Sequence, residues 1–187
     1  MMPNMTVLAP KNDRELEEML AFAVSFDGPI AIRYPRGSAH QGLQEYQAPV
    51  EYGRSEIIRK GKKIAVLGVG SMIPSCMEIC KGLKDDGYDP TFVNARFVKP
   101  LDVDLLDELA KDHSLFVTVE ENVKSGGYGE HVSAYMEACH PEIRVLSAAV
   151  WDRFVPQGNV ESLRSRIGLG VEDIRQAIED SEELREQ

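Results

Sequence analysis

Two arginines stand close together where an apolar run ends. The segment IAIRYPRGSAH (30–40) begins with three residues typical of a buried strand and continues with Arg33 and Arg36. A guanidinium group can donate two parallel, charge-assisted hydrogen bonds to a phosphate or a carboxylate. Because the ring of Pro35 fixes its own φ angle, Arg36 is a positioned donor at the carboxyl end of a strand. These residues predict an anion site at Arg36, with Arg33 and His40 as secondary candidates. The alternative is an arginine that pairs with a carboxylate at a domain boundary.

A glycine-rich turn follows two glutamates in VEENVKSGGYGEHV (119–132). Open α/β sheets bind ligands at the carboxyl ends of their strands, and a helix N-terminus favours an anion. The glycines from Gly126 to Gly129 would allow close backbone approach. However, the carboxylates of Glu120 and Glu121 would repel an anion there. A structural turn or a subunit contact is therefore the favoured interpretation, and a small-molecule site is the alternative.

Other motifs are interpreted as structural. Gly68–Ser71 lies where a dinucleotide-binding fingerprint would begin, but Ile73 stands where that fingerprint needs its third glycine. Cys76 and Cys80 are four residues apart on a predicted helix, so they could share a metal. Their neighbours are apolar and no histidine is close in sequence, which favours buried thiols and no metal site. The remaining histidines are assigned structural roles: His113, His131 and His140.

Strand-like and helix-like patterns alternate along the chain and would position these residues. From residue 63 onward, four strand–helix units predict an α/β fold, an open and mostly parallel sheet with helices on both faces. The expected strands are 63–70, 90–98, 115–122 and 142–150, and the expected helices are 72–87, 102–113, 127–140, 159–168 and 170–186.

The start of the chain has a different organisation. A strand at 5–10, a helix at 12–26 and a strand at 30–34 form a single βαβ unit, whose helix has Asn12 as cap and Glu15 in the capping-box position. One such unit cannot bury both faces of its strands. We therefore expect a truncated βαβ piece at 1–37, which packs on its own downstream domain or on another copy. A polar linker at 38–61, with a short strand at 55–59, and an α/β domain at 62–187 complete the expected division.

The composition excludes several classes of protein. The chain has 187 residues, a formal net charge of −10 and three cysteines. The negative charge argues against a nucleic-acid partner, and three scattered cysteines do not make a disulfide framework. No apolar run approaches the roughly 18 residues needed to cross a membrane, and the first residues lack the pattern of a signal peptide. We expect a cytoplasmic protein with no membrane partner.

Five segments together resemble one enzyme family. PNMTVLAP, DGPIAIRYPRG, ARFVKPLD, TVEENVKSGGYGEHV and FVPQG occur in family order over nearly all of residues 3–170. They are similar to the C-terminal part of the 1-deoxy-D-xylulose-5-phosphate synthases, thiamine-diphosphate enzymes of the transketolase superfamily. The resemblance implies a transketolase C-terminal domain preceded by the end of the pyrimidine-binding domain. One departure is Trp151-Asp152, where family members usually have Pro-Asp. Trp151 is expected at a surface groove or a subunit contact.

The resemblance also implies a reaction. The family condenses pyruvate with glyceraldehyde 3-phosphate, releases CO2 and supplies isoprenoid, thiamine and pyridoxal biosynthesis. Arg36 matches the second arginine of RYPRG, which in the family helps to hold the substrate phosphate. Thiamine diphosphate and Mg²⁺ serve the full-length enzyme, so we expect no catalytic, cofactor-binding or metal-binding residue here and no activity of this chain alone. The expected partners are the N-terminal domains of the same polypeptide and a second copy in a homodimer. The alternative is a purely structural assembly domain.

Overall fold

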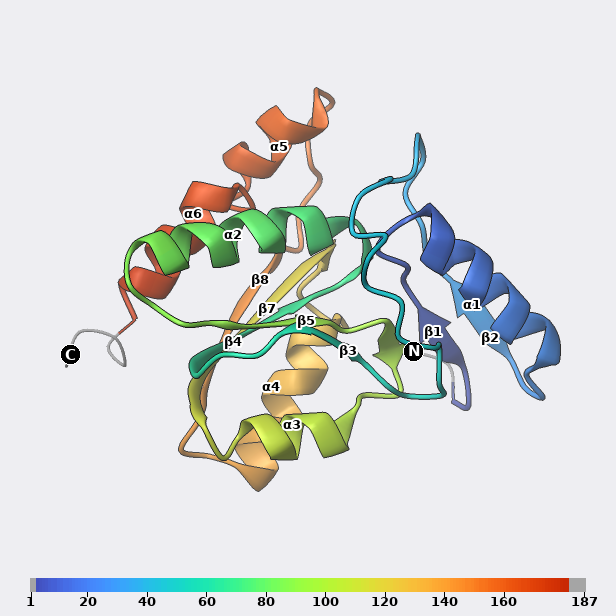
Figure 1. Ribbon diagram of the computed structural model, residues 1–187. Coiled ribbons are helices and arrows are strands. Elements are labelled where there is room, and N and C mark those ends of the chain that lie inside the picture. The colour runs from blue at the N-terminus through green and yellow to red at the C-terminus, as the bar shows by residue number, and fades with distance from the viewer. Residues whose placement is uncertain (1–2, 182–187) are drawn as a thin grey trace.

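A five-stranded sheet forms the centre of the molecule in the computed structural model, which describes residues 3–181 (Figure 1). Its strands are β3 (Glu56–Arg59), β4 (Lys63–Gly68), β5 (Thr91–Asn94), β7 (His113–Val123) and β8 (Arg144–Val150). Their order in the sheet is β3-β5-β4-β7-β8. Only the β3–β5 pair is antiparallel among the neighbours in this described sheet. The expected open, mostly parallel sheet is confirmed.

Helices cover both faces of this sheet (Figure 1). One face carries the short helix η1 (Gly70–Met72), α2 (Ile73–Asp85) and α6 (Val171–Glu179), and the other carries α3 (Val103–Leu109) and α4 (Tyr128–Cys139). The apolar strand β4 serves both layers, because Ile64 and Val66 join one buried cluster while Ala65 and Leu67 join the other. This explains why β4 is a near-continuous apolar run. The end of the helix expected at 170–186 lies outside the described residues.

A smaller sheet joins the start of the chain to the rest. Within residues 3–181 it consists of β1 (Thr6–Leu8), β2 (Ile30–Ile32) and β6 (Phe97–Lys99), in the order β2-β1-β6. The parallel strands β1 and β2 are connected by α1 (Asp13–Ser25), and β6 runs antiparallel to β1. The βαβ unit therefore packs on its own downstream domain, as expected.

The prediction of a single strand at 90–98 is wrong, because the chain leaves the larger sheet and joins the smaller sheet within this range. β5 ends at Asn94 and β6 begins at Phe97. Between them, Arg96 has a left-handed backbone with φ of 55°. This conformation is unusual for a residue with a side chain, and it redirects the chain from the larger sheet to β1. The local apolar pattern continues through the bend, so the pattern alone predicts one strand.

The polar segment after β2 has little regular structure. Residues 38–55 contain no helix or strand, and the short strand expected at 55–59 is present as β3 at the edge of the larger sheet. The division of the chain at residues 37 and 61 stays a prediction. α5 (Val160–Arg166) precedes α6 and has no buried residue. In the part of the chain that the structure describes, no helix has the length and apolar character needed to cross a membrane.

Candidate functional site

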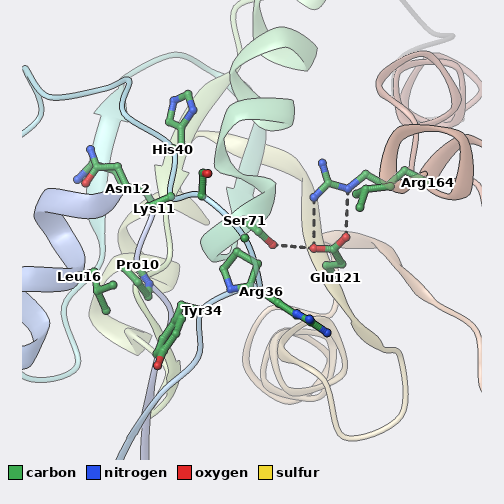
Figure 2. A pocket seen from close by; sticks show the side chains of 15 residues that line it. Pro10, Lys11, Asn12, Leu16, Tyr34, Arg36, His40, Ser71, Glu121 and Arg164 are labelled. Carbon is green, nitrogen blue, oxygen red and sulfur yellow. Dashed lines mark hydrogen bonds and ion pairs between the residues drawn. The ribbon is translucent and has the colours of Figure 1, made fainter. Parts of the chain in front are cut away.

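A cavity of about 360 Å³ lies where the carboxyl ends of strands from both sheets meet (Figure 2). Its lining comes from the segments that follow β1 (10–12), β2 (34–40) and β4 (Ser71). The lining is completed by Leu16 of the helix α1, by Glu121 near the end of β7, and by Val160 and Arg164 of α5. Ligands of open α/β folds bind in this position relative to the strands, so the cavity is the first candidate for a binding site.

Arg36 lines this cavity, as the sequence predicts for an anion ligand. Its side chain is exposed, and among residues 3–181 no carboxylate forms an ion pair with it within 4.0 Å. Pro35 precedes it, and Gly37 follows with φ of 127°, a conformation that glycine adopts without strain. The two neighbours thus turn the chain at the point where Arg36 lines the cavity.

The secondary candidates lie in two neighbouring places. His40 lines the same cavity as Arg36. Arg33 lines an adjoining cavity of about 160 Å³, together with Ser71 and Glu121. The backbone N–H of Arg33 donates to the Leu8 carbonyl at 2.7 Å, which extends the contact between β1 and β2. Arg36 and His40 therefore line one cavity, although Figure 2 shows their side chains pointing in different directions, and Arg33 lines the next cavity.

Glu121 accepts hydrogen bonds from two different elements at the cavity wall. Ser71 Oγ donates to its Oε2 at 2.8 Å. Arg164 donates from Nε to Oε1 and from Nη2 to Oε2, both at 3.2 Å (Figure 2). Glu121 was expected only as half of an acidic pair, and neither Ser71 nor Arg164 was predicted as a site residue. The position of Ser71 just after β4 is a usable signal, whereas nothing local marks Arg164.

A cluster of buried charges adjoins the cavity through Lys11. Lys11, Glu15, Glu56 and Arg96 are each at most 4% exposed. Lys11 Nζ lies 3.0 Å from Glu15 and 2.7 Å from Glu56, while Arg96 Nε lies 2.7 Å from Glu15. Asn94 Nδ2 donates to Glu15 at 2.9 Å. Two cations and two anions balance, which is the condition for burying charge at tolerable cost.

The buried cluster lowers the pKa of Glu56. Burial alone would raise the pKa of Glu56, but the hydrogen bond from Lys11 and the charges of Arg96 and Lys11 together hold that pKa below its usual value. Arg96 also donates to the carbonyls of Pro49 and Ala48 at 2.9 and 2.7 Å, and so fixes the irregular segment 38–55. The cluster therefore joins α1, this segment and the β5–β6 bend.

The cap of α1 is only partly as predicted. Asn12 Oδ1 accepts from the backbone N–H of Glu15 at 2.8 Å, which confirms Asn12 as the cap. The Glu15 carboxylate does not complete a capping box with Asn12. It accepts from the backbone N–H of Lys11 at 2.6 Å instead, because the buried cluster holds it there.

The glycine-rich turn binds a carboxylate of the chain itself. Glu120 is fully buried and accepts from the backbone N–H groups of Tyr128 and Gly129 at 3.0 and 2.8 Å, at the start of α4. A Cβ atom at Gly127 would lie 2.5 Å from Glu120 Oε1, and one at Gly129 would lie 2.5 Å from Thr118 Oγ1. Close packing thus explains these glycines, which supports the structural interpretation of the turn over a small-molecule site.

The thiols form no metal centre with their neighbours. Cys76 and Cys80 are buried, and burial raises the pKa of Cys80 to about 12 and that of Cys76 well above its usual value. Among residues 3–181, no group of three or more His, Cys, Asp and Glu side chains could hold a metal ion. The described residues therefore do not fit the Mg²⁺ that the family resemblance implies for the full-length enzyme.

Two histidines have structural partners. His113 Nδ1 donates to the Leu109 carbonyl at 2.8 Å, and its Nε2 lies 2.7 Å from Thr91 Oγ1. His140 Nε2 lies 2.7 Å from Asp107 Oδ1. Trp151 is 58% exposed and lines a cavity of about 170 Å³, which agrees with a surface groove.

Comparison with known proteins defines the class. Residues 53–174 match the family described as transketolase, C-terminal domain, and the chain belongs to this family. A solved structure described as a split gene transketolase, inactive beta4 tetramer, superposes with a TM-score of 0.90 at 27% identity and covers 99% of this chain and 59% of its own. Transketolase from Campylobacter jejuni has the same fold, with a TM-score of 0.67 at 17% identity over 96% of this chain and 27% of its own.

Two curated relatives of this chain have the same enzyme name. The 1-deoxy-D-xylulose-5-phosphate synthase of Lachnoclostridium phytofermentans is 43% identical over 92% of this chain, and that of Dictyoglomus thermophilum is 40% identical over 95%. The match falls in the C-terminal region of these proteins. The chain spans 28% and 29% of their lengths, respectively.

Proposed function

We propose that this chain is the C-terminal part of a 1-deoxy-D-xylulose-5-phosphate synthase. That enzyme condenses pyruvate with glyceraldehyde 3-phosphate, releases CO2 and supplies isoprenoid, thiamine and pyridoxal biosynthesis. The family membership, the synthase relatives and the cavity at the strand ends support this assignment.

Arg36 is the residue that we propose as the ligand of the substrate phosphate. The observation that carries this role is its position at a cavity of about 360 Å³ without an ion-pair partner among the described residues. A charged hydrogen bond contributes roughly 1.5–3 kcal/mol, and a guanidinium group can donate two of them to one phosphate. His40 and Arg33 are secondary contributors, because one lines the same cavity and the other lines its neighbour.

The cofactors belong to the full-length enzyme. Thiamine diphosphate supplies the carbanion chemistry of the synthase together with Mg²⁺, and we propose that segments other than residues 1–187 hold both. Residues 1–187 alone would then have no synthase activity. Their partners would be the N-terminal domains of the same polypeptide and a second copy in a homodimer, in the cytoplasm.

A purely structural role is the second candidate. The structural relative at TM-score 0.90 is described as an inactive tetramer, which favours a domain whose task is assembly. Phe154 is fully exposed and Trp151 is 58% exposed, so this chain also offers apolar surface for a subunit contact. On this alternative Arg36 would make no substrate contact.

Product analysis tests the proposed function. The complete polypeptide that contains this segment is supplied with thiamine diphosphate, Mg²⁺, pyruvate and glyceraldehyde 3-phosphate. Formation of 1-deoxy-D-xylulose 5-phosphate with release of CO2 is expected, and no product is expected from residues 1–187 alone. Turnover by the 187 residues, or none by the complete polypeptide, would contradict the proposal.

A further inference from the structure

The donors around Glu121 are those that a phosphate needs. Within the described residues, its carboxylate accepts from one serine hydroxyl and from two N–H groups of Arg164. Phosphate oxygens are acceptors of the same kind, and arginine recognises both groups with the same fork. Glu121 thus occupies a set of donors that could serve a ligand oxyanion.

The cavity beside Glu121 also contains Arg36, which is the proposed ligand of the substrate phosphate. Arg36, Ser71 and Arg164 all line it, and Figure 2 shows Arg164 reaching in from α5 towards Glu121. Lys11 also lines the cavity, but its ammonium group is committed to the buried carboxylates of Glu15 and Glu56. Among the described residues, Arg36 and Arg164 are therefore the two arginines that line this cavity, while Arg33 lines the adjoining one.

A ligand phosphate can replace Glu121 as the hydrogen-bond partner of Arg164, because the contact between the two side chains is weak. The two side chains are 21% and 34% exposed, and partly exposed ion pairs are weak because water and salt screen them. α5 has no buried residue in its seven positions, so the helix that carries Arg164 is held by few packing contacts. A doubly charged phosphate can therefore compete with one carboxylate for this guanidinium group.

We propose that Arg164 is a second phosphate ligand. Glu121 holds Arg164 in place before the phosphate binds, and it competes with the phosphate for the guanidinium group of Arg164. The ligand class is a phosphate monoester dianion, bound between Arg36 and Arg164. This inference rests on the proposed function in so far as Arg36 supplies the other half of the site. On binding, the Arg164–Glu121 hydrogen bonds break and bonds from Arg164 to phosphate oxygens form, with no change in covalent structure.

Binding of inorganic phosphate to the 187-residue chain, measured by titration calorimetry, tests this inference. Glu121→Gln is expected to strengthen binding by roughly fivefold or more, which is the lower end of the usual coupling between two sites, and Arg164→Gln is expected to weaken it. In the double variant, the gain from Glu121→Gln should disappear. If Glu121→Gln still strengthens phosphate binding when Arg164 is also replaced, the effect comes only from the removal of a negative charge, and the inference is overturned.

The outcomes separate this inference from the proposed function. If Arg36→Gln abolishes binding while Glu121→Gln and Arg164→Gln leave it unchanged, the inference fails and the role of Arg36 stands. If the Arg164 and Glu121 effects appear but Arg36→Gln changes nothing, the role of Arg36 fails and the second ligand stands. No saturable binding by the unmodified chain or by Glu121→Gln also overturns the inference. Unchanged circular dichroism spectra confirm that the variants, none of which replaces a buried residue, are folded.

Discussion

The Nε atom of Arg96 lies 2.7 Å from Oε1 of Glu15, although the two residues are 81 positions apart in the chain. Both side chains are 1% exposed. The pair joins α1 to the bend between β5 and β6, and it holds the N-terminal unit against the larger domain. The walls of the candidate site come from both of these units, so their relative position depends on this buried contact.

Removing the Arg96 guanidinium group should be strongly destabilising. Arg96→Met leaves Glu15 as a buried carboxylate that has lost one of its charged partners, and breaking a buried pair in this way costs about 3–5 kcal/mol. The measurement is the free energy of unfolding in urea. Arg144→Met is the matched control, because Arg144 is exposed on β8 and surface changes stay within about 0.5 kcal/mol. Equal effects of the two substitutions would show that the buried cluster does not stabilise the fold.

Glu56 should make the protein sensitive to acid. Its pKa lies below its usual value of 4.5 in the folded chain. A carboxyl group with a lowered folded pKa stabilises the protein fully above the unfolded pKa, and this contribution is lost as the pH falls through the folded pKa. We expect the free energy of unfolding to decrease below about pH 4.5, and Glu56→Gln to make that decrease shallower. An unchanged slope in the variant would refute the contribution of Glu56.

His113 should affect the stability of the protein at a higher pH than Glu56 does. Burial lowers the pKa of His113 from its usual 6.5, against the opposing effect of its hydrogen bond to the Leu109 carbonyl. The unfolded chain then binds a proton first, so the stability associated with neutral His113 is complete above about pH 6.5 and decreases as the pH falls towards the folded pKa. An NMR titration of the ring measures this pKa directly. A value at or above 6.5 would contradict the expectation.

Local patterns predicted most of the fold. The alternation of strand-like and helix-like segments from residue 63 onward was sufficient to predict a sheet with helices on both faces, and the alternate residues of β4 do lie in two buried clusters. Asn12 was predicted as a helix cap, and its side chain accepts the expected backbone hydrogen bond from Glu15. These features depend on residues close together in sequence, where spacing alone carries the signal.

The features that were missed depend on contacts between distant segments. Lys11, Glu56 and Arg96 read as ordinary polar residues, because charged side chains are almost never fully buried unless paired. Their pairing becomes visible only when α1, β3 and the β5–β6 bend meet. Arg164 likewise gains its role only through Glu121, 43 positions away. Arg36 was predicted because Pro35 and Gly37 mark its turn locally, and the structure places it at the cavity.

Steady-state kinetics of Arg36→Ala in the complete polypeptide tests the central claim most directly. The KM for glyceraldehyde 3-phosphate should rise about tenfold or more, because charged hydrogen bonds to the phosphate contribute roughly 1.5–3 kcal/mol each. The KM for pyruvate, which has no phosphate, should stay within about twofold, and Arg144→Ala should change neither value. Equal increases in both KM values, or no increase in either, would contradict the role of Arg36 as the phosphate ligand.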